Sequence, residues 1–164
     1  MMTLAEKVKV REQKIKELKE ELERKSDLLY KIELDLNYDE YYSNDTYSYP
    51  DEEEEDRETA SRLEIEIADL KKEIQWQEIV KDWEENGWTY ERMLMYVTVE
   101  RLKFSKYNKF TGHETEIIIE LTPNKYITIE DFNHNILEKD VVDLMPDDIK
   151  RLNRVLEFQG WFNA

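Results

Sequence analysis

The sequence contains no cysteine, and its 164 residues include only three glycines, three prolines and two histidines. The absence of cysteine excludes disulfides, thiolate metal sites and thiol nucleophiles. No P-loop, dinucleotide-binding fingerprint, HExxH pair or GxSxG elbow is present. No apolar run approaches the roughly 18 residues of a membrane span, and the N-terminal stretch MMTLAEKVKV lacks the apolar core of a signal peptide. We therefore expect a cytoplasmic protein that is not an enzyme and needs no cofactor or metal ion.

Charge is abundant and mostly negative. Forty acidic residues against 24 basic ones give a net charge of −16 and a pI near 4.6. Such a surface repels phosphates, so direct binding to nucleic acid is not expected. The same charge attracts basic proteins and speeds their encounter, although it also simply promotes solubility. A hydrophobic fraction of 40% permits a core where the apolar residues are patterned.

The first 36 residues carry a heptad pattern typical of a long helix. The seam positions alternate in steps of four and three, and only Arg11 and Lys25 are polar among them: Leu4, Val8, Arg11, Ile15, Leu18, Leu22, Lys25, Leu29, Ile32 and Leu36. We expect this helix to end at Asn37, a plausible C-cap, and Pro50 to prevent its continuation.

A second heptad pattern follows at Leu63, Ile67, Leu70 and Ile74 and is expected to stop at Asn86-Gly87. Two heptad-bearing helices joined by about twenty residues most simply form an antiparallel hairpin. The alternative is a parallel homodimer through the first helix. It would set Lys14 at a g position against Lys19 at an e position of the partner, and this repulsion favours the hairpin.

After Gly87 the pattern changes to that of strands. We expect strands at 93–104, 115–122 and 125–131, with a turn at 122–125. Pro146 followed by two aspartates predicts a last helix, which Gly160 ends. Its apolar face is expected to comprise Ile149, Leu152, Val155, Leu156 and Phe158. The predicted fold class is α+β: a helical hairpin over 1–87, then a domain over 88–164 with a small three- to four-stranded antiparallel sheet and a C-terminal helix.

Two clusters in the second half could carry chemistry. Residues 101–110, RLKFSKYNKF, combine bases with aromatic residues and could touch phosphates and stack a base. An alternating strand followed by a lysine-rich turn is the favoured interpretation, because the surrounding charge is acidic. His113, Glu116 and His134 could bind a metal ion, but an ordinary role for these histidines is favoured.

The most unusual stretch runs from 37 to 58, NYDEYYSNDTYSYPDEEEEDRE, and contains five of the ten tyrosines. Residues 35–58 hold eleven acids and the single base Arg57, which places −10 of the net −16 in this segment. Disordered acidic linkers are usually poor in aromatic residues, so the tyrosines argue against a mere solvating loop.

The stretch is expected to be a recognition surface. Carboxylates three or four residues apart on a helix are roughly 5–7 Å apart, a spacing of the order of neighbouring phosphates on a nucleic-acid strand. Tyrosine supplies rigid amphipathic area for interfaces. The candidate partner-binding residues are Tyr38, Asp39, Glu40, Tyr41, Tyr42, Asp45, Tyr47, Tyr49, Asp51, Glu52, Glu53, Glu54, Glu55 and Asp56.

In composition, the acidic stretch resembles the small acidic inhibitors that phages and mobile elements direct against restriction or CRISPR nucleases. The resemblance implies a non-catalytic anti-restriction or anti-CRISPR type of inhibitor, a nucleic-acid mimic that occupies a basic surface of a nucleic-acid-binding enzyme. The alternative is a structural coiled-coil scaffold that self-assembles, for example as a homodimer, through its helices. Neither interpretation involves a membrane.

Overall fold

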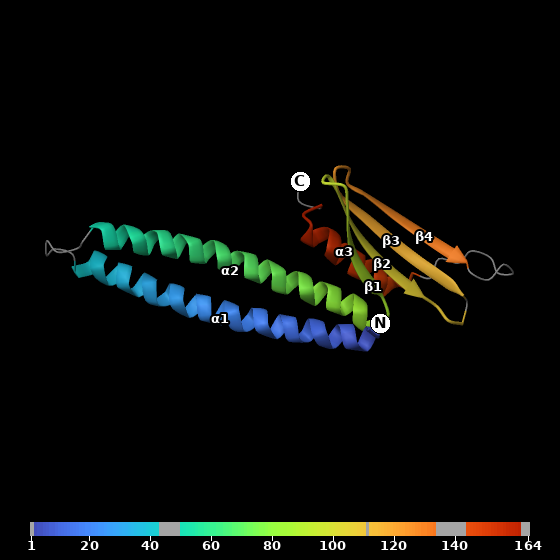
Figure 1. The fold of residues 1–164 in the computed structure, drawn as a ribbon, viewed down its shortest axis with the longest axis horizontal. Coiled ribbons are helices and arrows are strands. Elements are labelled where there is room, and N and C mark those ends of the chain that lie inside the picture. Colours follow the sequence, from blue (N-terminus) through green and yellow to red (C-terminus); the bar gives the residue numbers. More distant parts are fainter. Residues whose placement is uncertain (1, 43–49, 111, 134–143, 162–164) are drawn as a thin grey trace. The chain divides into compact units, whose positions relative to one another are not determined.

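The computed structural model describes residues 2–42, 50–110, 112–133 and 144–161, and only the backbone of 37–42, 50–53 and 131–133. Three helices and four strands are present in these residues: α1 (Leu4–Tyr42), α2 (Pro50–Glu85), β1 (Thr89–Met95), β2 (Val99–Tyr107), β3 (His113–Thr122), β4 (Tyr126–Asn133) and α3 (Pro146–Phe158) (Figure 1). The predicted α+β class, with a helix pair before an antiparallel sheet and a last helix, is confirmed. None of the described helices combines the length and apolar character needed to span a bilayer.

The chain forms two compact units, one of residues 12–77 and one of residues 1–11 with 78–164. We call them the hairpin unit and the sheet unit. The N-terminal end of α1 and the C-terminal end of α2 therefore belong to the sheet unit. The predicted division into a helical hairpin over 1–87 and a domain over 88–164 stays a prediction.

The hairpin unit consists of α1 and α2 running antiparallel. Lys14 pairs with Glu73 at 3.7 Å and Lys25 with Glu66 at 3.2 Å. A residue later in α1 therefore pairs with a residue earlier in α2, as antiparallel helices require. Apolar seam residues are buried along this interface: Ile15, Ala60, Leu63, Ile67 and Ile74. The heptad seams of α1 and α2 therefore pack against each other within one chain, as the hairpin interpretation predicted.

Both polar seam positions of α1 have carboxylate partners on α2. Lys25 pairs with Glu66, and Arg11, within the sheet unit, pairs with the buried Glu84. Arg11 also lies over the ring of Tyr90, with its guanidinium carbon 5.9 Å from the ring centroid. Polar residues at seam positions fix register and orientation in coiled coils at some expense of stability. These pairs favour the antiparallel register over any slipped one.

Replacing Lys25 with leucine is expected to leave the hairpin folded but to weaken its specificity. The seam becomes continuously apolar, so we expect a higher midpoint of thermal unfolding together with self-association. Circular dichroism and sedimentation velocity measure the two effects. Lys31→Leu, the same change at an exposed position, is the control and should leave the sedimentation unchanged. A Lys25→Leu chain that stays monomeric and unfolds at a lower temperature would contradict the role in register.

The end of the first helix and the start of the second helix both differ from the prediction. The first helix does not end at Asn37 but continues to Tyr42, and Pro50 is the first residue of α2 rather than a breaker before a later start. Proline suits the first helical position because the N–H that it lacks would have no partner there. The acids that follow it sit at the positive end of the helix dipole. The acidic stretch thus forms helix ends as well as a connection.

The sheet has the order β1-β2-β3-β4, and all of its neighbours pair antiparallel. The predicted strands at 115–122 and 125–131 correspond to β3 and β4. The predicted single strand at 93–104 is wrong, because a turn at 96–98 divides it between β1 and β2. This turn contains no glycine, proline or asparagine, and Tyr96 takes its left-handed conformation, with φ of 59°.

One face of the sheet carries the core of the sheet unit. Leu102 and Phe104 of β2 and Ile117 and Ile119 of β3 are buried on it, and α3 lies over this face (Figure 1). Leu152, Val155 and Leu156 of α3 are buried as predicted. Ile149 is not part of this apolar face, since it is 51% exposed near the start of the helix.

Trp83 near the end of α2 and Trp88 just before β1 complete this core. Trp83 stacks on Phe104 with ring centroids 4.3 Å apart and meets Trp88 edge-on at 5.1 Å. Gly87, with φ of 91°, ends α2 between them, and the Trp88 N–H donates to the Trp83 carbonyl. The predicted helix stop at Asn86-Gly87 is confirmed, and it turns the chain directly into β1.

Candidate functional site

The candidate partner-binding residues whose backbone the structure describes lie at the end of the hairpin where α1 stops and α2 starts (Figure 1). The backbone of α1 carries Tyr38, Asp39, Glu40, Tyr41 and Tyr42, and the first turns of α2 carry Asp51, Glu52, Glu53, Glu54, Glu55 and Asp56. Asp45, Tyr47 and Tyr49 lie outside the described residues. The antiparallel pairing brings the two flanking helix ends to the same end of the unit, which we call the acidic tip (residues 35–58).

The acidic tip places six consecutive carboxylates on the first turns of one helix. Residues four apart on a helix have Cβ atoms about 5–6 Å apart, so Asp51 and Glu55 are neighbours, as are Glu52 and Asp56. Glu54 and Glu55 are exposed, and Asp56 is half-buried at a seam position. Six consecutive positions of a helix with 3.6 residues per turn are distributed around its whole circumference, so these positions do not share one face.

The rest of the hairpin is close to charge balance, with acids and bases paired across and along the helices. Lys14 pairs with Glu73, and Lys25 bridges Glu21 at 3.1 Å and Glu66 at 3.2 Å. The hydrogen bond to Glu21, and then that to Glu66, raises the pKa of Lys25 above its ordinary value. The ammonium form of Lys25 is therefore the one that the fold favours.

The acidic tip cannot be neutralised by its own residues. Segment 35–58 has eleven acids and the single base Arg57, so the segment keeps a net charge of −10 however Arg57 is paired. This count holds for any conformation of the connection. The negative field of the chain is therefore concentrated at one end of the hairpin unit.

The basic-aromatic segment 101–110 is largely occupied by the fold. Arg101 binds Glu120 at 3.0 Å, Lys103 binds Glu116 at 3.0 Å, and Lys106 lies over the ring of Trp88. Hydrogen bonding to Glu120 raises the pKa of Arg101, and hydrogen bonding to Glu116 raises that of Lys103. With Phe104 also in the core, the favoured structural interpretation of this segment is supported.

The metal-site candidate is not assembled in the described part of the chain. His113 is buried on β3 and Glu116 faces Lys103, while His134 lies outside the described residues. No group of three or more histidine and carboxylate side chains suited to a metal ion occurs among residues with a described position.

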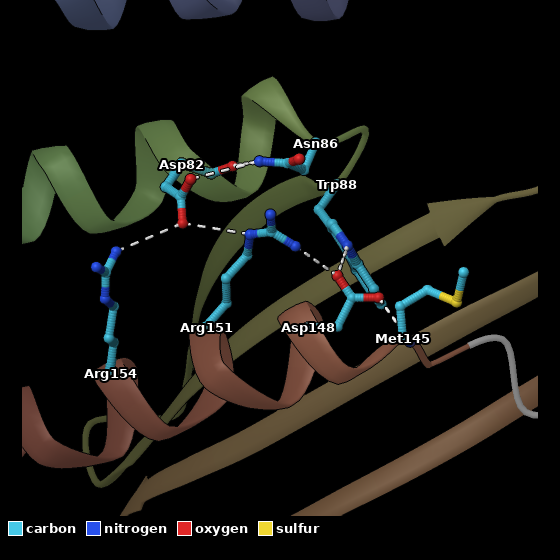
Figure 2. Close-up of polar contacts among 7 residues, drawn as sticks. All are labelled: Asp82, Asn86, Trp88, Met145, Asp148, Arg151 and Arg154. Carbon is cyan, nitrogen blue, oxygen red and sulfur yellow. Dashed lines mark hydrogen bonds and ion pairs between the residues drawn. The ribbon is translucent and has the colours of Figure 1, made fainter.

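A buried carboxylate that the sequence did not single out fastens α3 to the end of α2. Asp148 accepts hydrogen bonds from Trp88 Nε1 at 3.1 Å, Arg151 Nη1 at 2.8 Å and the backbone N–H of Met145 at 3.0 Å (Figure 2). Arg151 also reaches Asp82 at 3.2 Å, and Arg154 approaches the same oxygen at 3.6 Å. The contacts of Trp88 and Asp82 join α3 to the end of α2 and the segment that follows it, and the other two bonds lie within α3 and its N-cap, so the cluster is structural.

Comparisons with known proteins give no guide to the site: no family model matches the chain, and neither the curated proteins nor the solved structures yield a match.

Proposed function

We propose that this protein is a non-catalytic inhibitor that binds a basic nucleic-acid-binding surface on another protein. The excess of ten negative charges in residues 35–58, at the end of an otherwise nearly balanced hairpin, carries the proposal. A charge run that served only solubility could be spread along both helices. Concentrated at a tip, it forms a local potential that draws a basic groove to one place on the molecule.

In the proposed mechanism, carboxylates of the acidic tip take the positions that phosphates occupy in the groove. Arginine and lysine side chains pair with carboxylates by charge-assisted hydrogen bonds, as they do with phosphates. The five tyrosines of the stretch fill the space in which bases stack, since aromatic rings stack with sequence-tolerant energies of about 1–3 kcal/mol per base in such grooves. Nucleic acid and inhibitor then compete for the same surface.

The proposal extends to the setting in which the protein acts. An inhibitor of this kind, directed by a phage or another mobile element against a restriction or CRISPR nuclease, would work in the cytoplasm. The cysteine-free composition is compatible with that compartment.

Charge reversal at the acidic tip tests the proposal. We expect a chain with Asp51–Asp56 replaced by lysine to lose the basic protein that the unmodified chain captures from a nuclease-treated lysate, with an affinity loss of at least about a hundredfold. Mimicry further requires that a DNA or RNA oligonucleotide displace the captured protein, and that binding weaken steeply with salt. Pulldown followed by a competition titration measures both.

A matched variant separates position from total charge. It reverses six exposed acids on the sides of the two helices, namely Glu20, Glu23, Asp27, Glu33, Glu64 and Asp69, and changes the net charge by the same amount. We expect this variant to retain the partner with an affinity lowered by less than about tenfold. If both variants lose the partner equally, or if neither does, the acidic tip is not the binding surface.

The self-assembling scaffold is the competing proposal, and one observation favours it. Leu28, Leu34 and Ile65 are exposed on the outside of the hairpin, where a second copy could cover them. Sedimentation velocity of the unmodified chain separates the two proposals. A scaffold requires a stable oligomer at micromolar concentration, whereas the inhibitor requires none.

A further inference from the structure

The outer edge of β4 has no strand partner in the part of the chain that the structure describes. β4 stands at one end of the strand order and pairs with β3 on its inner side (Figure 1). An edge strand presents a row of backbone N–H and C=O groups that can pair with another strand. Natural proteins usually protect such edges with prolines, bulges or charged side chains.

β4 has little of this protection. Its eight residues, YITIEDFN, include no proline, and its register with β3 is continuous. Five of the eight are aromatic or β-branched, which are the residue types enriched in strands. Its two charges, Glu130 and Asp131, lie towards one end, whereas the opposite edge strand, β1, carries Glu91 and Arg92 at its middle. Of the two edges, that of β4 is therefore better suited to pairing with a further strand.

The side chains along this strand are accessible. Tyr126 is 40% exposed and Ile129 is 43% exposed. Lys125, just before the strand, and Glu130 are also exposed, and Ile127 is half-buried. A strand added beside β4 would therefore cover apolar surface, while its main-chain hydrogen bonds would supply affinity.

Geometry restricts how a second copy of β4 can pair with this edge. Along an antiparallel strand, the backbone groups of every second residue point to the same side. Two copies of one edge can therefore pair antiparallel only where the residues opposite each other both have odd numbers or both have even numbers. The two-fold axis then passes through one residue position, and the buried faces of both sheets lie on the same side of the joined sheet.

We propose that β4 pairs antiparallel with β4 of a second copy, with Thr128 opposite Thr128, and so joins two four-stranded sheets. This register sets Ile127 opposite Ile129. It also sets Lys125 opposite Asp131, and the symmetry forms each pair twice. Opposite charges directly across an antiparallel ladder are stabilising and like charges are destabilising.

Charge complementarity identifies the occupant as a second copy and also selects the register. Moving the two-fold axis to Ile127 sets Lys125 opposite Ile129, and moving it to Ile129 sets Ile127 opposite Asp131. An axis at Glu130 sets two glutamates against each other. Among these centres, only Thr128 pairs charge with opposite charge and isoleucine with isoleucine.

The charge of the sheet unit permits this association. Its residues, 1–11 and 78–164, include 18 acids and 14 bases, a net charge of −4. One pair of edge strands buries less than the roughly 1,200 Å² of a stable complex, so we expect a weak dimer with a Kd of about 10–100 µM. It differs from the scaffold, which requires a stable oligomer through the helices at micromolar concentration. The inference does not depend on the proposed function.

Exchanging the charges across the pair tests the proposal. Lys125→Asp sets aspartate opposite Asp131 in a homodimer, and Asp131→Lys sets lysine opposite Lys125. We expect each variant alone to raise the Kd at least about tenfold. An equimolar mixture of the two variants restores both opposite-charge pairs and should associate about as tightly as the unmodified chain. Sedimentation equilibrium over about 5 to 500 µM brackets the expected Kd, and circular dichroism checks that each variant is folded.

Ile129→Lys gives a second test that leaves Asp131 unchanged. It places a lysine, a residue that protects edge strands, opposite Ile127, and we expect the Kd to rise at least about tenfold. Leu94→Lys makes the same kind of change at an exposed position of β1. This control should leave the association unchanged.

Several results would overturn the proposal. A chain that stays monomeric over the whole range would show that the edge takes another occupant, a segment of its own chain or of another protein. A dimer that Ile129→Lys leaves intact would form through a different surface, and equal weakening by Ile129→Lys and Leu94→Lys would show no specific role for β4. Failure of the mixed, folded Lys125→Asp and Asp131→Lys chains to associate would overturn the pairing centred on Thr128. If Asp131→Lys does not fold, the comparison of Ile129→Lys with Leu94→Lys decides.

Discussion

Asp148→Ala is expected to lower the free energy of unfolding of the protein by about 3 kcal/mol. Asp148 is 2% exposed and its carboxylate accepts three hydrogen bonds, so its removal leaves the buried indole N–H of Trp88 and the part-buried N–H of Met145 without this partner. Removing one member of a buried charged pair typically costs about 3–5 kcal/mol. The lower end applies because Arg151 keeps Asp82 as a partner. Urea unfolding followed by tryptophan fluorescence measures the change.

Two variants separate the buried carboxylate from the charge at the start of α3. Asp147→Ala removes the same charge from the same helical turn, but Asp147 is exposed, so a cost below about 1 kcal/mol is expected. Asp148→Asn keeps an oxygen that can accept from the Trp88 indole but sets an amide donor against the Met145 N–H. An intermediate loss is expected for it. Equal effects of Asp147→Ala and Asp148→Ala would show that α3 is not fastened through Asp148.

The fold class followed from the sequence because periodicity alone decides it. Ten seam positions with only Arg11 and Lys25 as polar members leave little choice but a long helix that needs a partner helix. The pattern could not decide whether the partner is the same chain or a second one. The answer depends on which carboxylates pair with Arg11 and Lys25. Pairs such as Lys25 with Glu66 are seen only in the three-dimensional structure.

The wrong predictions concern a residue that suits two structural roles and a turn whose residues do not favour turns. Pro50 was interpreted as a helix breaker, although the residue is equally suited to the first turn of a new helix, and the acids after it support that assignment. The turn at Tyr96 was missed because its sequence contains no residue that favours a turn. Strain of this kind is set by the flanking strand pairing, not by local propensity.

The position of the acidic tip was predictable, and its surroundings were not. Charge counting located the ten-charge excess, and the antiparallel helices place it at one end of a hairpin. In the sequence, Asp148 stands out only as one of the two aspartates that follow Pro146 at the start of the last helix. The signal that could have identified its role is its place three residues after Met145, where a side chain can return to the N-cap backbone. Its third partner, Trp88, is 60 residues away in the chain and no local pattern points to it.

Trp83→Ala is expected to have the largest effect on the sheet unit, a loss of about 3–5 kcal/mol in the free energy of unfolding. Trp83 is fully buried and touches two aromatic rings, Phe104 in a stacked and Trp88 in an edge-on arrangement. Alanine would leave a cavity between the end of α2 and β2. The lost ring contacts add to the lost burial, since aromatic pairs contribute about 0.5–1.5 kcal/mol beyond their area.

Trp83→Phe distinguishes the ring from its polar atom. Among the described residues, Trp83 Nε1 has no hydrogen-bond partner although it is buried, and an unsatisfied buried donor costs about 1–3 kcal/mol. Phenylalanine removes that donor and keeps a ring to stack on Phe104, so the smaller cavity is partly offset. We expect Trp83→Phe to lose less than half of what Trp83→Ala loses in the same denaturation experiment. Equal losses would mean that the stacking on Phe104 contributes nothing, and that burial of the whole indole alone stabilises the junction of α2 with the sheet.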